Sequence, residues 1–410
     1  MSEPVLRSSP TPAQRSQRVI VAALGFTQIL GYGTSYYLLA ILSVPIASDT
    51  GWPLPWVIAG LSLGMLVGGI ASPLIGRAID RCGGRPLLML GSLLLAVGLA
   101  GVGLAYHVAL YLAAWCVIGV GMGAGLYEAA FGALGRLYGR DARAAITTLT
   151  LYGGFASTIC WPLTAFLNDA VGWRSTCFIY AGVHLFVALP LHLIFPRASV
   201  AQAETQPHSS DELRSAGSDL ASGRATTLIL LAVHLTLTAV IATIVSVHLL
   251  VILEARGYSS AAAVALGTLL GPSQVAGRAI ELVVGRSFHP LWTAIASSGL
   301  IAAGLAALLS GLPLVALAIV IYGAGAGVSY IVRGTLPLAL FGAAGYASLM
   351  GRLAFPSLIA QALAPWVAAF AFTRTGLDAF LVVLLMMGIL NLVLIGSVAR
   401  IRRDAEPPSG

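Results

Sequence analysis

The chain has 410 residues, of which 58% are hydrophobic and only 9% are charged, and its net charge is +7. Soluble domains usually carry about 25% charged residues, so this composition excludes an ordinary soluble protein and predicts an integral membrane protein. Every basic residue is an arginine. The arginines gather in short segments between apolar stretches, which favours a membrane-topology signal over a nucleic-acid surface. We therefore expect a lipid bilayer and no nucleic acid as partners.

Apolar stretches long enough to cross a bilayer recur along the whole chain. A hydrocarbon core of about 30 Å needs about 20 apolar residues in a helix. Residues 1–18 form a polar tail, and the stretch after it has no cleavage-like end, so we expect it to be retained as the first span. The predicted spans are 19–46, 55–75, 87–106, 110–135, 144–167, 175–195, 226–252, 260–280, 291–310, 313–333, 345–371 and 378–399.

The predicted spans fall into two sets of six. Residues 197–225, between the sets, are polar and lack an apolar run, which is typical of a flexible linker. We predict an all-α integral membrane protein with twelve transmembrane helices in two bundles, 19–196 and 226–399, and a polar tail at 400–410. An N-terminus in the cytoplasm leaves only Arg174, Arg256 and Arg374 in outside loops, so we expect both termini to be cytoplasmic in a bacterial inner membrane.

A short motif occurs once in each half. Gly76-Arg77-Ala78-Ile79-Asp80, followed by Gly84-Arg85, matches Gly277-Arg278-Ala279-Ile280-Glu281, followed by Gly285-Arg286, at a constant offset. The two copies lie at corresponding places after the second and eighth spans, which indicates an internal duplication. The two halves are therefore predicted to be pseudo-symmetric.

The first copy, 76–86, resembles the signature loop of the major facilitator superfamily. Gly172-Trp173-Arg174 and the glycine-rich fourth span extend this resemblance. It implies a fold of two six-helix halves, and it implies that Asp80 takes part in conformational gating. The alternative is that the arginines of the loop only set topology. The candidate gating residues are Gly76, Asp80, Arg81, Gly84, Arg85, Glu281 and Arg286.

The later spans are loosely similar to the monocarboxylate and oxalate–formate carriers of this superfamily. The similarity rests on Phe341-Gly342, Tyr346-Ala347, Gly351, Pro365 and Thr375-Gly376. In those carriers an arginine of the eighth helix binds the substrate carboxylate. Arg278 would then bind an anion, with Gln274 one turn earlier, where the monocarboxylate carriers place an acid. The position of Arg278 near the end of its span, and its match to Arg77, favour instead a cytoplasmic gating or topology role.

Glu128 is the only carboxylate deep in a predicted span, and a charge there is costly enough to suggest a function. It could bind a proton or a cationic substrate group, and the alternative is a structural hydrogen bond. The superfamily resemblance implies a central cavity lined by the first, fourth, seventh and tenth helices. Further substrate or proton candidates on those helices are Gln28, Tyr32, Tyr36, His234, Thr238, Tyr322 and Tyr330. Arg333 belongs to a loose polar stripe on the tenth span that indicates cavity lining, but its place near a helix end favours reaching toward the membrane surface.

These features together predict a secondary transporter that moves a small organic solute by alternating access. The chain has no Gly-x-x-x-x-Gly-Lys loop for ATP, no Cys or His pattern for a metal, and no hydrolase motif, so we expect neither a cofactor nor an enzyme. Glu128 favours proton coupling, and a cavity arginine would favour an organic anion such as a carboxylate. The alternatives are efflux of a drug or metalloid, import of a planar vitamin, a membrane enzyme, or a channel. We expect one chain to function as a monomer.

Overall fold

The computed structural model describes residues 12–196, 219–311 and 314–405, and helix is the only regular structure in these ranges. Parts of the predicted tails and linker, namely 1–11, 197–218 and 406–410, lie outside the described residues. The N-terminal half contains α1 (Pro12–Thr34), α2 (Leu38–Thr50), α3 (Leu54–Cys82), α4 (Gly84–Gly103), α5 (Val108–Gly125), α6 (Tyr127–Tyr138), η1 (Gly139–Asp141), α7 (Ala142–Gly153), α8 (Ala156–Val183), η2 (His184–Ala188) and α9 (Leu189–His192).

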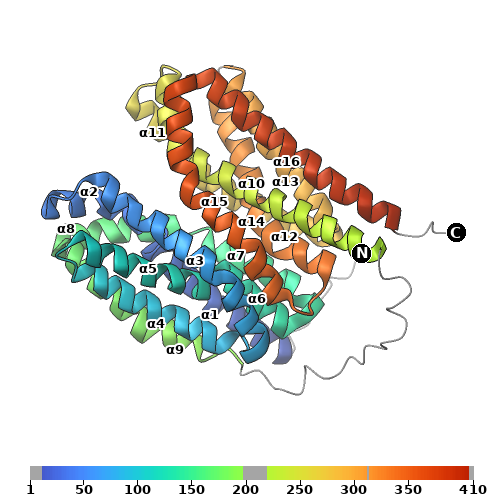
Figure 1. Cartoon of the computed structure of the whole chain (residues 1–410), viewed down its shortest axis with the longest axis horizontal. Coiled ribbons are helices and arrows are strands. Elements are labelled where there is room, and N and C mark those ends of the chain that lie inside the picture. The colour runs from blue at the N-terminus through green and yellow to red at the C-terminus, as the bar shows by residue number, and fades with distance from the viewer. Residues whose placement is uncertain (1–11, 197–218, 312–313, 406–410) are drawn as a thin grey trace, which may run out of the picture.

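The C-terminal half packs beside the N-terminal half as a second group of helices (Figure 1). It contains α10 (Asp219–Ala255), α11 (Ser260–Gly267), α12 (Leu270–Val284), η4 (Gly285–Ser287), α13 (Pro290–Leu309), α14 (Val315–Phe341), α15 (Tyr346–Thr375) and α16 (Leu377–Ala405).

Each of the predicted spans is occupied by helix, but several are broken. The long first span divides at Ser35–Tyr37 into α1 and α2, and the fourth divides at Leu126 into α5 and α6. Gly172, with φ of 79°, turns the chain inside α8 between the fifth and sixth spans. Only glycine adopts this left-handed conformation at little steric cost, which gives the Gly-Trp-Arg motif a structural reason.

Nine helices in the described ranges are long and apolar enough to cross a membrane. One of them, Val108–His192, covers three predicted spans. The predicted span 260–280 is not among the nine, because it is broken between α11 and α12. The number twelve therefore stays a prediction, whereas the helical membrane fold is confirmed.

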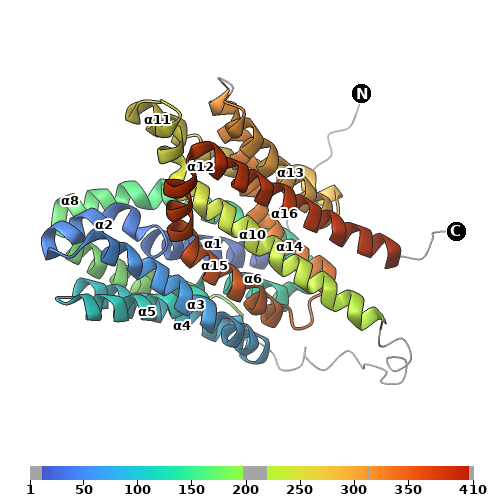
Figure 2. The same ribbon diagram turned by 45° about the horizontal axis from the view of Figure 1, so that its top comes forward.

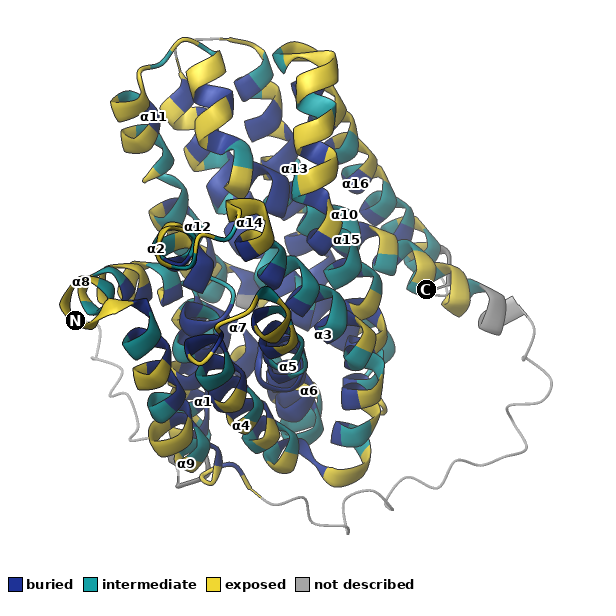
Figure 3. Cartoon of the chain, turned by 60° about the vertical axis from the view of Figure 1, so that its left-hand side comes forward, coloured by how far each residue is buried: buried dark blue, intermediate teal, exposed yellow. Residues whose placement is uncertain are grey.

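The outer faces of the helices carry large exposed apolar side chains, such as Phe186, Val283, Trp292 and Met386. Figure 3 shows these outer faces as exposed, with the buried residues inside each half. In a soluble protein such surfaces would drive aggregation, but in a bilayer they face lipid. Packing inside the halves depends on small residues: Gly64 and Gly119, for example, bring α3 and α5 into backbone contact.

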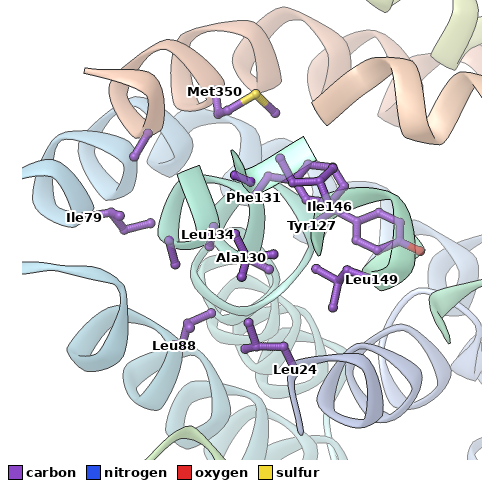
Figure 4. Close-up of a cluster of buried hydrophobic side chains, with 14 of the residues drawn as sticks. Leu24, Ile79, Leu88, Tyr127, Ala130, Phe131, Leu134, Ile146, Leu149 and Met350 are labelled. Atoms are coloured by element: carbon purple, nitrogen blue, oxygen red, sulfur yellow. The ribbon is translucent and has the colours of Figure 1, made fainter. Parts of the chain in front are cut away.

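The two halves meet most closely at one end of the molecule. There α3 crosses α15, and a Cβ on Gly76 or Gly351 would collide with a backbone carbonyl of the opposite helix, that of Ala347 or Ser72. An apolar cluster seals this end, and Met350 of α15 joins Phe131 and Leu134 of α6 in it (Figure 4). We call this end, where α3 meets α4 and α12 meets η4, the latch end.

At the opposite end the halves diverge. Helix α2 packs on α3 and α8 of its own half, while α11 packs on α10 and α14 of its own half. The two helices lie apart in both views of the ribbon (Figures 1 and 2). The two halves are therefore in close contact at the latch end and lie apart at the end that carries α2 and α11.

Candidate functional site: a charged cavity between the halves

A cavity lies between the two halves, beyond the latch end. Its volume is about 50 Å³, which is room for a few water molecules. Side chains from both halves form its wall: Tyr32, Tyr36, Tyr37, Met65, Met122, Leu126, Tyr127, Glu128, Arg278, Tyr330, Arg333, Leu358 and Gln361, together with Gly64, Gly68, Gly123 and Gly153. Arg278, Arg333 and Glu128 are the charged members of this wall.

The breaks in the first and fourth spans place key side chains in the cavity. Helix α5 ends at Gly125, and the extended Leu126 starts α6 in a new direction, with Glu128 in its first turn. Gln28 of α1 is fully buried and donates a 2.8 Å hydrogen bond from Nε2 to the Gly125 carbonyl oxygen. This bond satisfies a carbonyl at the helix end that would otherwise lack a partner. Gln28 itself does not line the cavity but supports the break that positions Glu128.

Glu128 pairs with Arg333 across the interface between the halves. The distance from Glu128 Oε1 to Arg333 Nη2 is 2.5 Å, and only 10% and 15% of the two side chains are exposed. Arg333, on α14, thus points into the cavity and pairs with a buried acid. The expectation that it reaches toward the membrane surface is wrong, because a paired charge is cheaper to bury than an isolated one.

Arg278, on α12, lies in the same wall and is 4% exposed. Its Nη1 donates to the Thr150 carbonyl oxygen of α7 at 2.8 Å, and its Nε donates to the Gly327 carbonyl oxygen of α14 at 3.1 Å. Its guanidinium carbon lies 4.6 Å from the centre of the Tyr330 ring. No carboxylate of the described residues lies within 4 Å of it, whereas Arg143, Arg174, Arg256 and Arg333 each have one.

The charges of the cavity wall therefore do not sum to zero. Glu128 neutralises one arginine, and Arg278 remains a buried cation whose partners are all neutral. Burying a charge without a counter-ion is unfavourable, so the arrangement is suited to receive one negative charge. Arg77, the equivalent of Arg278 in the first copy of the repeat, is exposed, and among the described residues it bonds only to the Pro73 carbonyl oxygen of its own helix.

Several predicted binding residues lie elsewhere. His234 is buried between α10 and α16, where Thr238 accepts a 2.8 Å hydrogen bond from Asn391. Tyr322 is buried in the core of the C-terminal half, and Gln274 is not part of the cavity wall. Helix α10, in the seventh predicted span, contributes no residue to the wall. The seventh helix thus supports the cavity without lining it.

The cavity also contains residues that the sequence did not single out. Tyr37, Tyr127 and Gln361 line it, and Thr243 of α10 contacts Gln361 at 3.4 Å. Tyr37 belongs to the same tyrosine-rich run as Tyr32 and Tyr36, so this run could have identified Tyr37 as a cavity residue. Gln361 is an amide inside a predicted span, and a polar side chain there is costly to bury and so indicates a function, as a charge does.

The candidate gating residues form two contacts between the halves at the latch end. Asp80 Oδ2 accepts a 2.7 Å hydrogen bond from the backbone N–H of Ser348, in the first turn of α15. Arg136 donates to the Asp80 carbonyl oxygen and so anchors the end of α3 within its own half. A carboxylate at a helix N-terminus is stabilised by the free N–H groups there.

The second copy of the repeat makes the corresponding contact from the other half. Arg143 of α7 lies 3.9 Å from Glu281 Oε1 and donates to the carbonyl oxygens of Gly285 and Phe288. Thr293 donates a 2.8 Å hydrogen bond to the same Glu281 oxygen. Each acidic residue of the repeat therefore touches the opposite half.

The remaining gating candidates have smaller structural roles. Gly84 starts α4, where a Cβ would collide with Ala133. Arg81 is exposed, and Arg85 is partly exposed. The side chain of Arg286 lies outside the described part of the structure.

Comparison with known proteins identifies the family. The family model described as Major Facilitator Superfamily matches residues 24–290. The chain belongs to the Major Facilitator Superfamily. The match spans both copies of the repeat and the cavity residues of the N-terminal half, so the resemblance of the 76–86 loop is confirmed.

Two curated relatives are monocarboxylate transporters. Monocarboxylate transporter 11 of Mus musculus is 29% identical over 177 residues, which are 40% of this chain and 37% of that protein. Monocarboxylate transporter 6 of Homo sapiens is 28% identical over 159 residues, 38% of this chain and 31% of that protein. The aligned stretch thus spans about a third of the length of each relative.

Solved structures share the fold along nearly the whole chain. The human organic anion transporter MFSD10 (TETRAN) has a TM-score of 0.70 at 16% identity and covers 94% of this chain and 100% of its own. The proton:xylose symporter XylE has a TM-score of 0.71 at 13% identity, covering 93% and 95%. FucP in its outward conformation has a TM-score of 0.69 at 14% identity, covering 94% and 99%. At these identities the likeness shows the fold alone.

Proposed function

We propose that this chain is a secondary active transporter of a small organic monoanion, and that Arg278 binds the carboxylate of the substrate. The observation that carries the proposal is a buried guanidinium in the cavity between the halves with no carboxylate within 4 Å. Charge-assisted hydrogen bonds from arginine to carboxylate are among the stronger polar interactions in proteins. The names of the two monocarboxylate transporters support the same class of substrate.

The charge of the cavity weighs against a cationic substrate. With Glu128 paired to Arg333, the wall carries one net positive charge. A lipophilic cation would face this charge without a free acid to bind, which is unfavourable in a poorly hydrated site. The cavity is thus less suited to efflux of a cationic drug than to transport of an anion.

In an alternating-access cycle, the two halves touch at one end of the molecule while they lie apart at the other, as the two ends do here. The latch end is held by Asp80 with Ser348 and by Arg143 with Glu281, while the opposite end is parted. A transport cycle would break both contacts, separate the halves at the latch end, and close them beyond the cavity. The cavity of about 50 Å³ would widen as the substrate enters.

Glu128 is proposed to couple transport to protons. Protonation would remove its charge, release Arg333, and give the cavity a second uncompensated arginine. Anion binding would then be stronger when Glu128 carries a proton, so that proton and anion bind together. Uptake into proteoliposomes should rise as the external pH falls, and Glu128→Gln should flatten this response. An unchanged pH profile in that variant would contradict the coupling role.

The experiment that tests the function is counterflow in proteoliposomes loaded with unlabelled acetate, pyruvate or benzoate. The wild-type protein should exchange at least one labelled monocarboxylate, and Arg278→Gln should lose most of this exchange. Arg352→Gln is the matched control, because Arg352 is exposed on α15 away from the cavity. An Arg278→Gln protein that exchanges carboxylates at the wild-type rate would overturn the assignment.

A further inference from the structure

Five tyrosines line the cavity together with Arg278. Tyr32 comes from the last turn of α1, Tyr36 and Tyr37 from the break between α1 and α2, Tyr127 from α6, and Tyr330 from α14. The ring centres of Tyr32 and Tyr127 lie 4.8 Å apart, and those of Tyr36 and Tyr37 lie 5.1 Å apart with the rings at 89°. We call these five residues the tyrosine sleeve.

Three hydroxyl groups of the sleeve have no hydrogen-bond partner among the described residues, unlike those of four tyrosines in the cores. Tyr111, Tyr180, Tyr322 and Tyr346 are buried in the cores, and each has a hydrogen bond to a protein group. In the sleeve, Tyr127 donates to the Thr150 carbonyl oxygen. The hydroxyls of Tyr32, Tyr37 and Tyr330 make no hydrogen bond to any described residue. Buried polar groups are usually satisfied, so these hydroxyls are available to water or a ligand in the cavity.

From the sleeve and the single uncompensated charge, we propose that the substrate is an aryl monocarboxylate: a planar aromatic ring that carries one carboxylate. This inference rests on the proposed function and specifies its substrate. A carboxylate on Arg278 places the rest of the molecule against Tyr330, on which the guanidinium itself stacks. The N-terminal half adds Tyr32, Tyr36 and Tyr37 to the wall.

The remaining wall suits a ring better than a chain of polar groups. Met65, Met122, Leu126 and Leu358 are apolar, and the methionines can form favourable contacts with an aromatic ring. Gln361 is the one amide side chain of the wall, so a polyhydroxylated molecule would find few side-chain partners besides the tyrosine hydroxyls. Ring-on-ring contacts add free energy beyond the burial of apolar area.

Competition against counterflow, with thermal stabilisation of the purified protein, tests this substrate class. The ligands are benzoate, cyclohexanecarboxylate and acetate, which share one charge and differ in the ring. Benzoate should bind about tenfold more tightly than cyclohexanecarboxylate, since aromatic pairing adds to burial of a similar area. Equal affinities for benzoate and cyclohexanecarboxylate would overturn the aryl assignment and leave the carboxylate assignment intact.

Variants of one sleeve residue separate the contribution of the aromatic ring to binding from that of the hydroxyl group. Tyr32→Phe should keep the preference for benzoate over cyclohexanecarboxylate, whereas Tyr32→Leu should reduce this preference by about threefold or more. Tyr111→Phe, in the core outside the cavity, is the control for general loss of stability. If Tyr32→Leu leaves the preference unchanged and Tyr36→Leu and Tyr37→Leu do so too, the sleeve does not select the ring. A failure of all three acids to bind would instead overturn the proposed function itself.

Discussion

At the scale of single residues, two arginines do not lie where their positions at the ends of predicted spans suggest. Arg333 was expected at the membrane surface, and Arg278 was left open between a cytoplasmic gating role and an anion-binding role, yet both line the cavity. The number of residues from the start of a predicted span does not determine depth in the membrane when the helix is broken or tilted. The span of Arg278 is broken in this way, because α12 begins only after the break at Thr268–Leu269. The resemblance to the monocarboxylate carriers indicated a cavity position for Arg278, whereas its place near the end of the predicted span indicated the membrane surface.

The pair of Glu128 and Arg333 gives a prediction for stability. Removing one partner leaves the other charged and uncompensated, so Glu128→Gln or Arg333→Gln alone should each lower the free energy of unfolding by about 3 kcal/mol. The double variant should lose less than the sum of the two, because neither charge remains. Thermal unfolding of the four proteins checks this. Strictly additive effects would mean that the two side chains do not interact.

At the scale of helices, the sequence located the segments well but missed where they break. Hydropathy follows the period and length of apolar runs, so the predicted ranges coincide with helices. The breaks at Ser35–Tyr37 and Leu126 depend on tertiary partners such as Gln28, which bonds the Gly125 carbonyl oxygen. These breaks place Tyr36, Tyr37 and Glu128 in the cavity, so its full wall could not be read from periodicity alone.

The crossing of α3 and α15 gives a prediction at the same scale. Gly351 packs against the Ser72 carbonyl oxygen, so Gly351→Ala should force α15 away from α3 and weaken closure of the latch end. Labelling of Cys82, which is exposed at the end of α3, should become faster as closure of the latch end weakens. Gly396→Ala on α16 is the control, because open space surrounds that position. Identical labelling and transport in both variants would show that the crossing tolerates a methyl group.

At the scale of the whole molecule, the repeat predicted pseudo-symmetric halves, and the structure adds that its two acidic residues touch opposite halves. Asp80 reaches α15, and Glu281 reaches Arg143 of α7. The fold follows from composition, span spacing and the signature loop, because these reflect the bilayer and the duplication. The identity of the cavity residues depends on how the two halves meet, which no local pattern encodes.

Rigid linkage of the two halves at the latch end should stop transport. Asp80→Cys and Ser348→Cys, in a Cys82→Ala background, place two thiols across the contact between α3 and α15. A short bifunctional cross-linker should abolish counterflow, and a reducible linker should restore it after cleavage. The same protein before linkage serves as its own control. Full counterflow in the linked protein would contradict alternating access through this end.

The central claim is that one uncompensated positive charge in the cavity selects one carboxylate. The most direct measurement is thermal stabilisation of the purified protein by benzoate and by its neutral amide, benzamide, in the wild type, Arg278→Gln and Arg352→Gln. We predict that benzoate stabilises the wild type and Arg352→Gln, and that Arg278→Gln loses at least about tenfold in benzoate affinity. Benzamide should bind all three proteins alike. Equal benzoate affinity in Arg278→Gln and the wild type would contradict the claim.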